Sequence, residues 1–278
     1  MEKKTPDGSS IVLIRQVRQA LFRALTSEKA VIVLVREGRK TVRNGKHSVE
    51  VRKGMVGVLP AYLPLMIENQ PAESGRYVAS AIIPDDSVIM SAKRDGLRNG
   101  NPFLATRQDR TVAAFERATD LLDDPFTPSE LKNNAVREVL LWLGTEGIGF
   151  GEERSASFSD ILREKIAAEP DTNWRSTSAA QAMAVSEATL RRRLSACGTS
   201  FNDLLTDVRM TRALGLLQTT ELPINRISLD CGYASASRFA MRFRARFGLA
   251  PSKIRRDNNA RIGTSFDRIG AVKQLSKK

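Results

Sequence analysis

The stretch that decides the fold runs from about residue 177 to residue 256, because it contains a helix–turn–helix plan twice. The first copy ends on SEATLRRRLSAC at 186–197, and the second ends on SASRFAMRFRARF at 235–247. In each copy a serine precedes the last helix and a glycine follows it, as is usual for helix N-caps and C-caps. Between the copies, residues 199–218 carry apolar side chains at spacings of three and four, which predicts one longer helix. The sequence therefore predicts an all-helical C-terminal domain.

The remainder of the C-terminal third is also predicted to form short helices. Ser157 or Ser159 is expected to cap a helix that runs through Ala168, and an alanine-rich helix is expected over residues 177–184. A helix that begins at Pro223 supplies the first half of the second copy, since proline suits a first helical turn.

A helical wheel of residues 235–247 separates a buried side from an exposed side. Phe239, Phe243 and Phe247 define the buried side, and the opposite side is small, polar and positive. Small residues let a helix enter the major groove of DNA, where arginine can bind guanine through two hydrogen bonds. The residues predicted to meet base edges are Ser237, Arg238 and Met241. Those predicted to meet phosphates are Arg242, Arg244 and Arg246.

The same wheel for residues 186–197 buries Leu190 and Leu194. The residues predicted to meet base edges are Ala188, Thr189 and Arg192, and those predicted to meet phosphates are Arg191 and Arg193. An arginine run taken alone is more often a solvated helix face. The repeated plan favours DNA binding, because a spacer helix of about 20 residues is roughly 30 Å long. That length is close to the roughly 34 Å between successive major grooves.

The charge distribution indicates an anionic partner for the same region. The chain of 278 residues has a formal net charge of +13, and residues 186–256 contain 13 basic and 5 acidic residues. Charge alone does not choose between nucleic acid and anionic lipid. No apolar run approaches the length of a membrane-spanning helix, and no secretory signal is visible. We therefore expect a cytoplasmic protein that does not bind a membrane.

Few residues are available for histidine or cysteine chemistry. His47 is the single histidine, and Cys197 and Cys231 have no neighbouring ligands, so no metal site and no cofactor are predicted. Both cysteines are expected to be small buried hydrophobes, and His47 is expected at the surface. The alternative is a DNA-repair or sensor protein that uses one of the cysteines as a nucleophile. We favour a protein without enzymatic activity.

The N-terminal half is predicted to contain strands followed by helices. Between residues 30 and 84, β-branched runs alternate with Gly, Pro and Asn turns, which suggests a small sandwich or barrel. Helical periodicity appears at 111–122 and at 131–143. The earlier segment 11–25, IVLIRQVRQALFRAL, is ambiguous between strand and helix. A candidate dimer face, with core packing as the open alternative, consists of Leu131, Val136, Leu140 and Leu143.

Together these patterns predict an α+β chain of two domains. The first is a small β-barrel with following helices over residues 1–145, and the second is an all-α domain with two helix–turn–helix units over 158–257. Residues 146–157 form the predicted glycine-rich linker, and 258–278 form a basic, mobile tail.

Residues 186–256 resemble the DNA-binding domain of the AraC/XylS family of transcription regulators. The residues that carry the resemblance are Gly232, Tyr233, Ser235, Ser237, Phe239, Phe243, Phe247, Gly248, Pro251 and Ser252. The resemblance implies a seven-helix module with two recognition helices in successive major grooves, and a sequence-specific regulator that is usually an activator. Met241 stands where many members have arginine, so we expect the first unit to carry more of the specificity.

The N-terminal half resembles, more loosely, the cupin-like barrel that many members use for effector binding and dimerisation. The resemblance implies double-stranded promoter DNA and RNA polymerase as partners, a small-molecule effector in the N-terminal domain, and a homodimer. Some relatives bind fatty acids between their two domains, and basic residues of this chain would suit a carboxylate.

Overall fold

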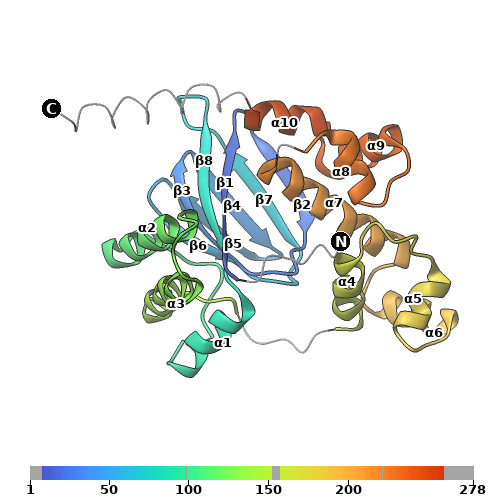
Figure 1. Cartoon of the computed structure of the whole chain (residues 1–278), viewed down its shortest axis with the longest axis horizontal. Helices are drawn as coiled ribbons and strands as arrows, with labels where there is room; N and C mark the ends of the chain where they lie inside the picture. The colour runs from blue at the N-terminus through green and yellow to red at the C-terminus, as the bar shows by residue number, and fades with distance from the viewer. Residues whose placement is uncertain (1–7, 98, 152–156, 221, 260–278) are drawn as a thin grey trace.

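The computed structural model describes residues 8–97, 99–151, 157–220 and 222–259. The N-terminal half consists of two β-sheets and helices α1 to α3, and the C-terminal half consists of helices α4 to α10 (Figure 1). Residues 152–156 of the predicted linker and 260–278 of the predicted tail lie outside the described residues. The first residues of the predicted linker pack with the N-terminal half, because Ile148 is buried in its core.

Two antiparallel sheets form the centre of the N-terminal half. The five-stranded sheet has the order β1 (Ser10–Gln16), β8 (Tyr77–Ile83), β3 (Val31–Glu37), β6 (Val56–Leu59) and β9 (Ala105–Thr106). The four-stranded sheet has the order β2 (Ala20–Leu25), β7 (Leu65–Gln70), β4 (Arg39–Asn44) and β5 (His47–Arg52). The ambiguous segment 11–25 therefore forms strands, one in each sheet.

The predicted barrel is not closed. Within the described residues the two sheets share no ladder, so β1 and β2 end at separate edges. The C-terminal helices contact these edges: α7 and α10 meet β1, and α9 meets β2. The rings of Phe22 and Phe247 meet edge to face, with centroids 5.8 Å apart. Apolar burial against helices thus takes the place of barrel closure, which a strand pattern alone does not reveal.

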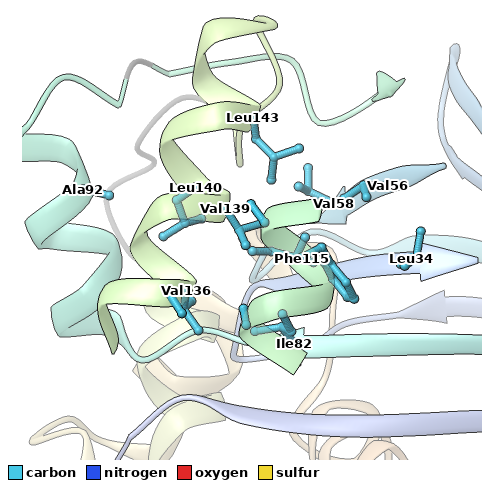
Figure 2. Close-up of a cluster of buried hydrophobic side chains, with 14 of the residues drawn as sticks. Leu34, Val56, Val58, Ile82, Ala92, Phe115, Val136, Val139, Leu140 and Leu143 are labelled. Atoms are coloured by element: carbon cyan, nitrogen blue, oxygen red, sulfur yellow. The ribbon is translucent and has the colours of Figure 1, made fainter. Parts of the chain in front are cut away.

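Helices cover the outer face of the five-stranded sheet. They are α1 (Asp86–Arg94), α2 (Asp109–Asp123) and α3 (Ser129–Thr145), and Figure 2 shows their apolar side chains against β3, β6 and β8. The candidate dimer face belongs to this core, since Val136, Leu140 and Leu143 are each at most 1% exposed and only Leu131 of that set is open, at 53%. Core packing is therefore the outcome for those three residues. Helix α1 was not predicted, although Asp85 caps it by accepting from the Ser87 amide.

The C-terminal helices begin and end close to the residues predicted from their caps. They are α4 (Phe158–Ala168), α5 (Ser176–Ala182), α6 (Glu187–Ala196), α7 (Phe201–Thr219), α8 (Ile224–Asp230), α9 (Ala236–Phe247) and α10 (Pro251–Asn259). Ser157, Ser186 and Ser235 each accept a hydrogen bond from a backbone amide of the first turn. Gly248 ends α9 in the left-handed conformation, with φ of 73°.

Helix α7 connects two separate cores. Leu204 and Val208 pack in the first core with residues of α4, α5 and α6. Met210, Ala213 and Leu217 pack in the second core with α8, α9, α10 and strands of the four-stranded sheet. Each helix–turn–helix unit is therefore built on its own stretch of one continuous helix.

Candidate nucleic-acid interface

The first helix–turn–helix unit consists of α5 and α6. The turn between them includes Ala184 in the left-handed conformation, with φ of 52°, and Ser186 then caps α6. Leu190 and Leu194 are each 1% exposed and fix α6 against the first core. Because α6 buries only this side, its remaining sides face away from the core.

Most of the residues predicted to meet DNA from α6 are exposed. Ala188, Arg191 and Arg192 lie on its open surface. Thr189 is half-buried, and its hydroxyl accepts from the Ser186 hydroxyl at 3.0 Å, so this side chain also belongs to the N-terminal cap. Arg193 is exposed but leans over the ring of Phe158 at 5.1 Å, which holds it toward α4 at the flank of the unit.

The second unit consists of α8 and α9. Phe239, Phe243 and Phe247 are at most 3% exposed, as the helical wheel predicted. Residues predicted to meet bases or phosphates lie on the exposed side: Ser237, Arg238, Met241, Arg242 and Arg244. Met241 is 63% exposed, so its side chain is available on this face.

Arg246 differs from the other arginines of α9. Its side chain is only 20% exposed, and its Nη2 donates to Oδ1 of Asp207 on α7 at 2.5 Å. The guanidinium also lies over the Phe247 ring. Arg246 therefore takes part in a contact between helices, and the helical wheel could not show its acidic partner on α7.

Arg209 of α7 is a further residue that the sequence analysis missed. Its guanidinium donates to the carbonyl oxygens of Pro170 at 3.0 Å and Thr172 at 2.9 Å, and it lies over the ring of Tyr233. Gly232 makes this approach feasible, because a Cβ there would lie 2.5 Å from the Pro170 oxygen and because its φ is +75°. The Gly232-Tyr233 pair thus serves the packing of α8 and α9 onto α7.

The two cysteines have different surroundings. Cys231 is buried, and burial raises the pKa of its thiol to about 12, so the nucleophilic thiolate is scarce at neutral pH. Cys197 is exposed at the end of α6, so the expectation that both cysteines are buried was wrong for this one. His47 is exposed, as expected, and stacks on the ring of Phe103.

No group of three or more His, Cys, Asp and Glu side chains in the described ranges is arranged to hold a metal ion. In the same ranges, no helix combines the length and the apolar character needed to cross a membrane.

Comparison with known proteins agrees with this architecture. A family model described as a helix-turn-helix domain matches residues 179–257. The urease operon transcriptional activator of Escherichia coli is 37% identical over 262 residues, which cover 85% of this chain and 86% of that protein. The chain belongs to the AraC/XylS family of transcriptional regulators. It is a sequence-specific DNA-binding regulator with a helix-turn-helix domain that includes α6 and α9.

Other relatives of this AraC/XylS regulator match less of the chain. The virulence regulon transcriptional activator VirF of Shigella flexneri is 32% identical over 100 residues, which cover 36% of this chain and 38% of that protein. Unsaturated fatty acid bound ToxT from Vibrio cholerae superposes with a TM-score of 0.68, covering 93% of this chain and 99% of that chain. At 13% identity, that likeness shows a shared fold.

Proposed function

We propose that this AraC/XylS regulator activates transcription by binding promoter DNA with α6 and α9 in two successive major grooves. The observation that carries the proposal is the pair of exposed, arginine-bearing helix faces at the two ends of α7. Helix α7 has 19 residues and is therefore roughly 28 Å long, near the roughly 34 Å of one DNA turn.

We assign base contacts and phosphate contacts to different residues of the two faces. Arg192 and Arg238 suit the two acceptors of guanine. Four smaller or apolar residues beside them are also assigned to base contacts: Ala188, Thr189, Ser237 and Met241. Arg191, Arg193, Arg242 and Arg244 are assigned to phosphates, which set affinity more than sequence preference. Arg246, also predicted to meet a phosphate, is proposed here to act in the contact with Asp207, with which it forms an ion pair.

The relatives support a role for the N-terminal half and for further partners. One relative is named as an activator of the urease operon, and one structural neighbour was solved with an unsaturated fatty acid. We infer that the N-terminal half of this regulator responds to a small-molecule effector, and that the protein acts on RNA polymerase at promoters, as a homodimer and in the cytoplasm. We infer no enzymatic activity, because the named relatives are regulators and the Cys231 thiol is buried.

Single arginine substitutions test the base assignment. A duplex would first be selected from a random pool by the full chain, and then each base of its half-sites would be varied. Arg192→Ala and Arg238→Ala should each weaken specific binding by about 1–3 kcal/mol and relax the preference at one position. Arg191→Ala is the matched control, because it should weaken binding to all duplexes alike and reduce the salt dependence.

The same measurement can contradict the proposal. If all three variants lose affinity equally and keep the wild-type sequence preference, the assignment of faces is wrong. If the wild-type chain itself binds every duplex equally, the protein is a nonspecific basic scaffold.

A further inference from the structure

Asp207 occupies a central place between the two DNA-binding units. It lies near the middle of α7, where its Oδ2 accepts from Nη1 of Arg163 at 2.7 Å and its Oδ1 accepts from Nη2 of Arg246 at 2.5 Å. Arg163 belongs to α4, which packs with α6 in the first core. Arg246 belongs to the last turn of α9. One carboxylate therefore bonds to α9 of the second unit and to α4, which shares a core with the first unit.

The three charged groups are largely shielded from solvent. The exposed fractions of their side chains are 10% for Arg163, 15% for Asp207 and 20% for Arg246. Shielding strengthens a charge-assisted hydrogen bond and makes the loss of one partner costly, because the other charges stay buried. The two ion pairs of Asp207 thus constrain the direction in which the helices approach one another more than the surrounding apolar contacts do, because apolar contacts are non-directional.

The two units pack on different stretches of α7, so the ion pairs of Asp207 can affect their relative orientation. The first unit packs on Leu204 and Val208 of α7, and the second unit packs on Met210 and Leu217. Neither core reaches across the whole helix, so contacts that cross between the two cores help to set the orientation of one unit relative to the other. Asp207 lies within the first of these stretches, next to Val208, and its carboxylate accepts from Arg163 of α4 and from Arg246 of α9.

We propose that Asp207 is a positioning residue that fixes the orientation of α6 relative to α9, and thereby the spacing of the two half-sites that the regulator accepts. The proposal rests on the proposed function, since it requires both recognition helices to bind one duplex. Asp207 itself faces the arginines of α4 and α9 and makes no contact with bases.

The test is the dependence of binding on half-site spacing. One base pair inserted between the half-sites turns the second by about 35° and moves it by about 3.4 Å. The full wild-type chain should lose about 100-fold in affinity on this duplex, because the two units no longer bind together. Asp207→Asn should bind the original duplex less tightly, but should lose only about tenfold on insertion, because its units can reorient.

A matched control lies one turn earlier in the same helix. Asp203 bonds to Ser200 at the start of α7, and Asp203→Asn should keep the spacing dependence of the wild-type chain. Arg246→Gln removes the ion pair between Asp207 and α9 but leaves the bond from Arg163, and it supplies a second variant if Asp207→Asn does not fold, as judged by thermal unfolding. It too should flatten the dependence on spacing. If Arg246 instead meets a phosphate, affinity will fall by the same factor on both duplexes.

The outcomes separate this proposal from the one on which it rests. A wild-type chain that is indifferent to spacing would overturn the proposed two-groove function. A wild-type chain that discriminates spacing, together with folded variants that discriminate it equally well, would overturn the role of Asp207 alone. Flattened spacing dependence in Asp207→Asn and Arg246→Gln, with Asp203→Asn unchanged, would support it.

Discussion

The two DNA-binding units meet the N-terminal half of the molecule in different ways. The second unit shares an apolar core with the four-stranded sheet, in which the rings of Phe22 and Phe247 touch. On the side of the first unit, the contacts with that half are polar and are made by α4, which shares a core with α6: Tyr62 donates to Glu164, and Glu28 lies 3.9 Å from Arg163. Apolar burial holds α9 firmly, whereas the polar contacts near α6 are sensitive to charge. A change in the N-terminal half should therefore reach α9 through packing and α6 through electrostatics.

The largest effect is expected from removing the ring that joins the second unit to the sheet. Phe22 is 3% exposed, and Phe22→Ala should lower the free energy of unfolding by about 3–5 kcal/mol, because it leaves a cavity in a shared core. Hydrogen exchange should rise in α9 as well as in β2, and stay unchanged in α6. Phe126→Ala, at a residue that is 91% exposed, is the control and should change stability by less than about 0.5 kcal/mol. An equal rise of hydrogen exchange in α6 and α9 would contradict the idea that only α9 is held to the N-terminal half by apolar packing.

A middle-sized effect is expected from adding an arginine to the exposed face of α9, where Met241 now stands. Met241→Arg places a guanidinium on the exposed side of α9, where it should add about 1–3 kcal/mol of discrimination for a guanine at one position. Met241→Lys is the matched control, because it adds the same charge without the planar fork of donors. Base-by-base binding measurements should show a new preference only for the arginine variant. A uniform gain for both variants would place residue 241 beside the phosphates.

The smallest effect is expected from the polar contact near the first unit. Burial is the main cause that raises the pKa of Glu28, while Arg163 lowers it and Asp207 and Glu164 raise it. A raised pKa in the folded state means that the carboxylate opposes folding above that pKa, and that this cost disappears as the pH falls toward 4.5. Glu28→Gln should therefore stabilise the chain at pH 7 by less than about 1 kcal/mol.

Thermal unfolding from pH 4 to pH 8 would measure that gain, which should shrink on acidification. A variant that is less stable than the wild-type chain at pH 7 would mean that the ion pair with Arg163 outweighs the burial of Glu28. Charge attraction would then stabilise the contact on the side of the first unit, in contrast to the apolar packing of α9.

Local patterns were enough to predict helices α6 and α9. Ser186 and Ser235 cap α6 and α9 as expected, and the phenylalanines of α9 are buried at the predicted spacing. These features depend on neighbours within one or two turns, which the sequence displays directly. The same logic predicted α2 and α3 but missed α1, whose nine residues are short for periodicity.

Contacts between distant segments were not predictable in this way. Arg246 has the same appearance in sequence as Arg242 and Arg244, yet only the fold brings Asp207, 39 positions away, to its guanidinium. Lys40 lies in an ordinary strand pattern, but it is 3% exposed between the two sheets and bonds to Asn69. Burial lowers the pKa of its ammonium group to about 7.

The sequence by itself determined that two capped, arginine-bearing helices flank one long helix, because caps and helical faces are set by residues three or four positions apart. Tertiary structure alone decided that the sheets stay open, that helices fill the gap beside β1 and β2, and that Asp207 joins the two units. These outcomes depend on which surfaces lose water together, and that is settled only when segments far apart in the chain meet.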